Sequence, residues 1–331
     1  MSNTLLEFKN LVTEFHTEGT TVKAVNNISF TLNKGETVGI VGESGSGKSV
    51  TSLSAMRLIP SPPGIISGGS IIFHTKNGEK VDLLKISEEK MREHRGNDLA
   101  MIFQEPMTSL NPVFTCGDQV LEAIMLHQKL KKDAAKKLTI KLFKKVQLPD
   151  PERIYNTYPH QISGGQKQRV MIAMAMSCEP SVLIADEPTT ALDVTVQKTI
   201  LLLMQELQRD QDMGILFITH DLGVIAELAD KVVVMYKGNI VEQGSVWDIF
   251  NNPKHPYTKG LLACRPTLNT QKKRLPTVED FLNPKKDTNL VVDLDFSSQS
   301  KSENVLLEVQ NLCTYFPTKK SWLGNPIEFV K

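Results

Sequence analysis

The sequence is poor in cysteine, in net charge and in long apolar runs, and each shortage excludes a class of protein. Its cysteines, Cys116, Cys178, Cys264 and Cys313, lie too far apart for a disulfide framework or a metal site. A net charge of +1 gives no electrostatic footprint for nucleic acid. No apolar stretch reaches the ~18 residues of a membrane span, and Met1–Asn10 does not resemble a signal peptide. We expect a soluble chain that reaches a membrane only through a partner.

Short apolar runs alternate with longer helical patterns along most of the chain. Five runs predict strands buried on both faces of a largely parallel sheet, because they are apolar almost without interruption. They are Thr37–Val41, Leu99–Phe103, Val182–Ala185, Ile215–Thr219 and Val232–Met235. Helical stretches such as Gly165–Ser177 and Thr195–Arg209 lie between them. This alternation predicts an α/β fold.

Two segments depart from that alternation. Leu5–Leu11 and Ala24–Leu32, separated by turn-forming residues, predict an antiparallel hairpin at the N-terminus. Residues 129–145 hold eight lysines and one acid, and their apolar residues recur at helical spacing, which predicts a surface helix with one apolar and one basic face. The apolar face is expected at Leu130, Ala134, Leu138, Leu142 and Val146.

Residues 42–49 carry the most informative motif, which fits G-x-x-x-x-G-K-S at every fixed position. The motif follows a predicted strand and precedes a helical stretch, which is the context that a phosphate loop requires. Its glycines let backbone N–H groups face a phosphate, and the helix N-terminus adds positive potential. We assign nucleotide contacts to Gly42, Glu43, Ser44, Gly45, Ser46, Gly47, Lys48, Ser49 and Val50. Lys48 is expected to reach the β- and γ-phosphates, and the Ser49 hydroxyl to bind Mg²⁺.

Two carboxylates, Asp186 and Glu187, directly follow a predicted buried strand. Ligands of open α/β sheets lie at the carboxyl ends of strands, so this acidic pair is expected beside the phosphate loop. Asp186 is assigned to Mg²⁺, and Glu187, on the other side of the strand tip, to the attacking water. An acidic pair after a strand is more often a helix cap or a turn, but the phosphate loop favours the catalytic interpretation.

A third motif narrows the class of nucleotide hydrolase. Residues 162–166, Ile-Ser-Gly-Gly-Gln, resemble the Leu-Ser-Gly-Gly-Gln signature of the ATP-binding-cassette (ABC) superfamily. Gln104, residues 191–193 and His220 resemble the Q-loop, D-loop and switch histidine of that family, in the same order along the chain. The resemblance covers about residues 1–268. It implies an ABC-type P-loop NTPase core with an N-terminal antiparallel β-subdomain and a helical subdomain inserted at about residues 91–178.

The resemblance also implies ATP and Mg²⁺ as cofactors, and it completes the list of site residues. The signature residues Ser163, Gly164, Gly165 and Gln166 open a helix and form a second anion site. By resemblance this site meets ATP bound to another cassette, so two cassettes pack head to tail. Asp193 and Gln104 join the nucleotide contacts, and the implied metal ligands are Ser49, Gln104 and Asp186. The implied catalytic residues are Lys48, Gln104, Glu187 and His220. Phe15 is the expected adenine shelf, with His16 or Val22 as alternatives.

Two further stretches point to a subfamily. Residues 103–112 are similar to the Q-loop of dipeptide, oligopeptide and nickel importer ATPases, and residues 252–262 to the start of their C-terminal extension. Many such extensions carry grouped cysteines for an iron–sulfur cluster, but Cys264 stands alone here, so we expect no cluster. The resemblance implies an ATP-hydrolysing motor subunit of an importer for peptides or related small solutes. Its expected place is peripheral, at the cytoplasmic face of the inner (plasma) membrane.

The implied partners are integral membrane permease subunits, a second cassette and, indirectly, an extracytoplasmic solute-binding protein. The permease is expected to dock near Gln104–Pro112 and residues 114–128. The alternative function is a soluble tandem ABC ATPase that acts on ribosomes or DNA. We disfavour it because the chain has no sustained heptads between phosphate loop and signature, and because the extension is typical of transport.

An internal repeat marks the C-terminal end of the sequence. Residues 5–15 recur as residues 306–316, with seven of eleven positions identical, and Val330-Lys331 resembles Val22-Lys23. We therefore expect an ABC nucleotide-binding domain over residues 1–250 and an importer-type extension and linker over 251–303. Residues 304–331 are expected to be a truncated second ABC domain, a two-strand fragment that is mobile or pairs with an exposed edge.

Overall fold

The structure is a computed structural model that describes residues 3–17, 19–104, 109–190, 192–264, 276–282, 305, 307–320 and 326–330. The chain divides into two units, one of Met1–Thr267 with Leu275–Thr288 and one of Leu268–Arg274 with Asn289–Lys331. Three predicted features lie outside the described residues: Q-loop residues 105–108, Ala191 of the D-loop, and most of the predicted linker. No helix in the described part of the chain is long and apolar enough to span a bilayer.

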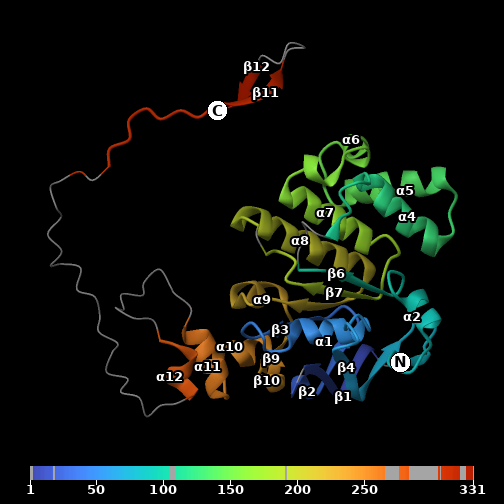
Figure 1. The fold of residues 1–331 in the computed structure, drawn as a ribbon, viewed down its shortest axis with the longest axis vertical. Coiled ribbons are helices and arrows are strands. Elements are labelled where there is room, and N and C mark those ends of the chain that lie inside the picture. The colour runs from blue at the N-terminus through green and yellow to red at the C-terminus, as the bar shows by residue number, and fades with distance from the viewer. Residues whose placement is uncertain are drawn as a thin grey trace. The chain divides into compact units, whose positions relative to one another are not determined.

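A six-stranded sheet lies at the centre of the first unit, with strand order β10-β9-β3-β8-β7-β6 (Figure 1). The strands are β3 (Thr37–Val41), β6 (Leu99–Ile102), β7 (Val182–Asp186), β8 (Gly214–Ile218), β9 (Lys231–Tyr236) and β10 (Asn239–Ser245). Only β10 is antiparallel to its neighbour. The predicted α/β sheet is confirmed, and each predicted strand agrees with the observed one to within one residue at each end.

A second sheet of four strands has the order β2-β1-β4-β5. Its strands are β1 (Thr4–Thr17), β2 (Thr20–Asn33), β4 (Gly64–His74) and β5 (Lys80–Asp82). β1 and β2 form the predicted antiparallel hairpin, in which Phe15 pairs with Val22 and His16 with Thr21. The N-terminal antiparallel part of the fold is thus confirmed.

The described residues of the first unit form helices, of which some pack on the two faces of the six-stranded sheet and others pack on other helices. The helices are α1 (Lys48–Ala55), α2 (Glu88–His94), α4 (Cys116–Gln128), α5 (Lys132–Lys145), α6 (Pro151–Tyr155), α7 (Gly164–Ala175), α8 (Val194–Gln211), α9 (Leu222–Leu228), α10 (Val246–Asn251), α11 (Pro256–Ala263) and α12 (Val278–Leu282), with a 3₁₀ turn at Pro159–Gln161. Side chains of a strand alternate between faces, so each strand contributes to two cores. Ile184 and Ile218 pack with the second sheet and α1, whereas Leu183 and Phe217 pack with α4 and α7–α9. α1 and α7 therefore lie on opposite faces of the sheet (Figure 1).

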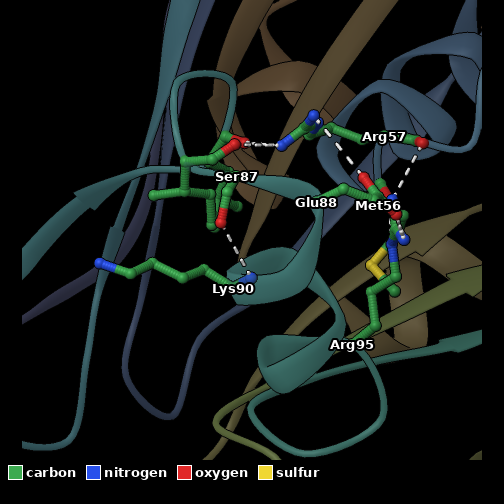
Figure 2. A network of polar contacts seen from close by, with 8 residues as sticks. Met56, Arg57, Ser87, Glu88, Lys90 and Arg95 are labelled. Atoms are coloured by element: carbon green, nitrogen blue, oxygen red, sulfur yellow. Dashed lines mark hydrogen bonds and ion pairs between the residues drawn. The ribbon is translucent and has the colours of Figure 1, made fainter.

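The C-terminal end of α1 is held by a polar network (Figure 2). The Arg95 guanidinium, just after α2, donates to the carbonyl oxygens of Met56 and Arg57 at 2.8 and 3.1 Å. Both arginines also pair with Glu88 at the start of α2. Since these bonds satisfy carbonyls that the helix end leaves without partners, they fix the far end of the helix that begins at the phosphate loop.

The lysine-rich helix α5 buries the predicted apolar stripe except at one residue. Its buried residues are Ala135, Thr139, Leu142 and Phe143, while the predicted core residue Ala134 is exposed. Of the five predicted residues, Leu142 and Val146 are buried and Leu130 and Leu138 pack against the core, so the prediction is wrong at Ala134 alone. The buried stripe also includes Thr139. Its hydroxyl donates to the Ala135 carbonyl at 2.9 Å, which allows the side chain to be buried.

In the second unit, β11 (Phe316–Lys320) and β12 (Pro326–Val330) form an antiparallel pair. The repeat predicts a strand from residue 306 onwards, but residues 307–315 are in no strand. Leu307 and Leu312 are 79% and 78% exposed, whereas their repeats in β1, Leu6 and Leu11, are fully buried. The reason for this difference is that no second sheet covers these leucines among the described residues.

Candidate active site

Four predicted site segments meet at the carboxyl edge of the six-stranded sheet because their strands are neighbours. β3, β8, β7 and β6 lie side by side in that order. They lead respectively into the phosphate loop, His220, the pair Asp186 and Glu187, and Gln104. Residues that are up to 178 positions apart in sequence (220 − 42) thus line one edge. Open α/β sheets bind ligands at this edge.

The phosphate loop has a backbone that only glycine allows at one key position. Gly47 has φ +102°, and a Cβ atom there would lie 2.3 Å from the Ala24 carbonyl oxygen. The next residue, Lys48, begins α1 and is buried, with its Nζ donating to the carbonyls of Gly42 and Glu43 at 2.8 and 3.0 Å. Burial lowers the pKa of Lys48, and the nearby carboxylates oppose this shift only in part. The ammonium therefore lies inside the turn of backbone, where a phosphate would meet it.

Ser49 and Asp186 form an oxygen pair beside that lysine. The Ser49 hydroxyl donates to Asp186 Oδ1 at 3.0 Å. Asp186 is only 4% exposed, and this burial raises the pKa of its carboxyl, against the effect of the Ser49 bond. A hydroxyl and a carboxylate are hard oxygen ligands, and Mg²⁺ is commonly held by one or two carboxylates together with substrate phosphates. The pair fits a magnesium ion that arrives with a nucleotide.

The Glu187 carboxylate accepts hydrogen bonds from two side chains and lies at ion-pair distance from a third. Gln104 Nε2 lies 3.2 Å and Thr190 Oγ1 3.1 Å from its Oε2, while His220 Nδ1 lies 3.2 Å from its Oε1. Its backbone has φ +45°, a conformation that a non-glycine residue adopts at a cost of about 1–3 kcal/mol. This strained turn places the Glu187 carboxylate at the edge of the sheet. Three of the predicted residues, Gln104, Glu187 and His220, lie together there. Thr190 was missed by the sequence analysis, because a threonine three residues after an acid is a common turn signal.

The signature begins a helix, as predicted. Ser163 is the N-cap of α7: its Oγ accepts from the Gln166 N–H at 3.3 Å, and its own N–H donates to Gln166 Oε1 at 3.0 Å. Gly165 leaves no room for a side chain, since a Cβ atom there would lie 2.7 Å from Val196 of α8. Asp193 caps α8 through the Val196 N–H at 2.9 Å. In this chain Asp193 thus has a structural partner, and its nucleotide contact stays a prediction.

The predicted adenine shelf lies at the hairpin end of β1. Phe15 is half-buried and lies against Gly64 of β4, and its cross-strand partner Val22 is 55% exposed. His16 points to the other face of the hairpin, where its Nδ1 lies 3.0 Å from Thr21 Oγ1. Of the three residues considered, Phe15 and Val22 share a face and His16 does not.

Fold and site together define a P-loop nucleotide-binding cassette with a signature helix. The ABC transporter family model matches residues 25–190, and the model of the oligopeptide/dipeptide transporter C-terminal region matches residues 241–286. The chain belongs to the ABC transporter family.

The relatives agree with that membership. The chain is 48% identical to the oligopeptide transport ATP-binding protein OppD of Bacillus subtilis over 333 residues, 97% of this chain and 89% of that protein. It is 47% identical to the glutathione import ATP-binding protein GsiA of Pectobacterium atrosepticum over 320 residues. That match covers 97% of this chain but 51% of GsiA, so the chain spans about half the length of this relative.

Solved structures support the same fold. The dimeric structure of the bacterial ABC transporter cassette MJ0796 superposes with a TM-score of 0.64 at 24% identity, over 73% of this chain and 99% of that one. The cbiO1 protein of Clostridium perfringens, described as part of the ABC transporter complex cbiONQ, gives a TM-score of 0.62 at 27% identity, over 76% of this chain and 92% of that one. At 24% identity, the likeness to MJ0796 supports the fold of this chain and not its role.

Proposed function

We propose that the chain is an ATP-hydrolysing motor subunit of an ABC importer for peptides or related small solutes. One observation carries the proposal: Lys48, Ser49 and Asp186 lie at the same sheet edge as Glu187, which accepts a hydrogen bond from Gln104 and lies at ion-pair distance from His220. The printed names of the relatives, oligopeptide transport and glutathione import, support the choice of cargo class. They also disfavour the alternative of a ribosome- or DNA-directed ATPase.

The residues of the phosphate loop bind and orient ATP in this proposal. Lys48 exchanges the carbonyls of Gly42 and Glu43 for β- and γ-phosphate oxygens, and loop N–H groups surround the phosphates. Ser49 and Asp186 would hold Mg²⁺, with Gln104 as the third predicted ligand. Magnesium bound there would neutralise charge on the phosphate oxygens while water attacks the γ-phosphate and ADP leaves.

Glu187 serves as general base for the attacking water. Its three partners, Gln104, Thr190 and His220, hold the carboxylate in one orientation, which is the pre-organisation that proton abstraction requires. His220 is 65% exposed at its side chain, so it is open to a γ-phosphate on the solvent side.

The signature is proposed to act on ATP held by another cassette. Lys48 and Ser163 begin helices that pack on opposite faces of one sheet, which argues against their meeting within one chain. Head-to-tail packing of two cassettes places each signature N-terminus against the other's phosphate loop. ATP binding then favours the closed pair and hydrolysis the open one.

The proposed permease surface lies beyond Gln104. Val113 and Phe114 are 71% and 54% exposed just ahead of α4, and Phe103 is 42% exposed at the end of β6. Exposed apolar side chains on both sides of residues 104–112 support the proposal of a partner surface. We place the subunit peripherally at the cytoplasmic membrane face, with the solute-binding protein reached only through the permease.

Residues 304–331 are proposed to open a second cassette. β11 and β12 pair Phe316 with Val330, and the repeat relates these two residues to Phe15 and Val22, which pair in the first hairpin. The exposed leucines of the repeat, Leu307 and Leu312, correspond to Leu6 and Leu11, which are buried in a core in the first copy. A second cassette in the same protein would supply the partner that the signature needs.

The test is ATP hydrolysis by the purified chain, followed by affinity purification from membranes. We expect Mg²⁺-dependent phosphate release that is lost in Lys48→Ala, and co-purification with integral membrane proteins. Recovery of ribosomes instead of membrane proteins would favour the alternative function, and absence of ATP turnover with a native fold would refute the proposal.

A further inference from the structure

A side chain of the C-terminal extension contacts the phosphate loop. Tyr257, the second residue of α11, is fully buried, and the Glu43 N–H donates to its hydroxyl oxygen at 2.9 Å. The two residues are 214 positions apart. This is a bond between the segment matched by the oligopeptide/dipeptide C-terminal model and the loop that carries Lys48.

Glu43 connects that tyrosine to the lysine of the loop. Its N–H is held by Tyr257, and its carbonyl oxygen accepts from Lys48 Nζ at 3.0 Å. One residue of the loop is therefore fixed on both sides. The Glu43 side chain is exposed and takes no part in either bond.

Tyr257 is itself held rigidly. Its ring packs on Tyr236 at the end of β9, with centroids 4.3 Å apart. The Glu242 carboxylate accepts from the backbone N–H groups of Lys254 and His255 at 2.8 and 3.0 Å, which secures the entry to α11. His255 Nδ1 in turn accepts from the Tyr257 N–H at 3.1 Å. Strand β9 is the neighbour of β3, the strand that leads into the phosphate loop. Tyr257 is therefore held by a strand that lies next to the one that carries the loop.

The phenol stays neutral under working conditions. Burial raises the pKa of Tyr257 to about 12, so its oxygen remains a hydroxyl at any pH at which the protein is studied. A neutral hydroxyl is a fitting acceptor for a backbone N–H next to anionic phosphates, because it adds no negative charge to the site.

We propose that Tyr257 is a positioning residue for the phosphate loop, through which the C-terminal extension keeps the Glu43 peptide in place for binding of ATP phosphates. The inference rests on the proposed ATPase function and goes beyond it, since it gives the extension a role in nucleotide binding. Loss of the Tyr257 hydroxyl removes one hydrogen bond from a loop that must present several N–H groups together, and leaves the part-buried Glu43 N–H without this acceptor.

The experiment compares Tyr257→Phe with the wild-type full chain. Phenylalanine keeps the ring and its packing on Tyr236 and removes the hydroxyl alone. We expect KM for ATP and Kd for MgATP to rise about fivefold, with kcat within about twofold of wild type, the scale of one lost hydrogen bond. The matched control is Tyr155→Phe, a buried tyrosine of α6 whose hydroxyl lies 3.5 Å from Asp118, away from the loop.

The outcomes separate the two proposals. A rise in KM and Kd for Tyr257→Phe but not for Tyr155→Phe supports the inference. Unchanged KM and Kd, equal changes in both variants, or a fall in kcat alone would overturn it. Wild-type chain that neither binds nor hydrolyses ATP would refute the proposed function itself. A second variant, Glu242→Ala, removes the carboxylate that holds the entry to α11 and leaves Tyr257 itself unchanged. We expect the KM for ATP to rise in this variant as well.

Discussion

Gln104 Nε2 donates to Glu187 Oε2 across 3.2 Å and so ties the end of β6 to the end of β7. Gln104 also begins the segment that we propose as the permease surface. Movement of that segment would pull on the carboxylate proposed as general base. A single bond of this kind gives a permease a direct way to alter the geometry of hydrolysis.

Substitution of Glu187 by glutamine is expected to leave ATP binding intact and to slow turnover at least ~10²-fold, because the amide keeps the shape but cannot accept the proton of water. Phosphate release and equilibrium ATP binding measure the two effects. Glu206→Gln, the same change at an exposed position on α8, is the control and should retain wild-type turnover. Undiminished hydrolysis in Glu187→Gln would remove Glu187 from its assigned role.

Ser163→Arg is expected to abolish ATP-driven dimers without weakening ATP binding by the isolated chain. A long cation at the first turn of α7 blocks close approach of another cassette, while the phosphate loop of the same chain lies elsewhere on the sheet. Light scattering in the slow Glu187→Gln background measures dimer formation, with Glu187→Gln alone as the reference. Normal dimers in the double variant would contradict the arrangement in trans.

Sequence patterns predicted those parts of the site that depend on local order. The phosphate loop, the acids after β7 and the signature each lie within a few residues of a strand or helix end, so a strand pattern and a turn were enough to place them. The strands themselves were placed well because runs such as Val182–Ala185 are buried on both faces and carry only apolar residues.

The features that sequence patterns did not predict depend on contacts that the patterns do not show. Tyr257 lies in a stretch whose resemblance to importer ATPases was recognised, but nothing in its neighbourhood indicates that its hydroxyl reaches Glu43. The burial of Thr139 in α5 was not predicted, because it depends on a bond within its own helix. Similarly, the repeat predicted a strand at Leu307, but a strand also needs a neighbouring strand to pair with.

Asp186→Asn is expected to stabilise the nucleotide-free chain while it abolishes Mg²⁺-dependent turnover. Burial raises the pKa of Asp186 above its ordinary value of 3.8, so the folded chain carries an unfavourable charge at neutral pH. The native state binds this proton more tightly than the unfolded state, hence the destabilisation is complete above the folded pKa and disappears as the pH falls below 3.8. Removal of the charge should raise Tm by about 2–4 °C at pH 8, or ~1 kcal/mol.

The pH dependence is the internal control for that variant. The difference in Tm between Asp186→Asn and wild type should shrink as the pH is lowered towards the ordinary aspartate pKa. A gain that does not change with pH, or a lower Tm at pH 8, would show that the buried charge is not what the substitution relieves.

Two C-terminal deletions distinguish the proposed second cassette from the extension. A chain that ends at residue 303 lacks β11, β12 and the exposed leucines, none of which the first unit needs for its cores, so its Tm and ATPase rate should equal those of the full chain. A chain that ends at residue 251 also lacks α11, and with it the fully buried Tyr257 and the apolar residues Leu261 and Leu262 that pack on the large core. Loss of a large buried aromatic residue costs about 3–5 kcal/mol, so Tm should fall by about 10 °C and the KM for ATP should rise. Equal damage by both deletions would mean that residues 304–331 are an integral part of the first unit, and the assignment of a second cassette would be wrong.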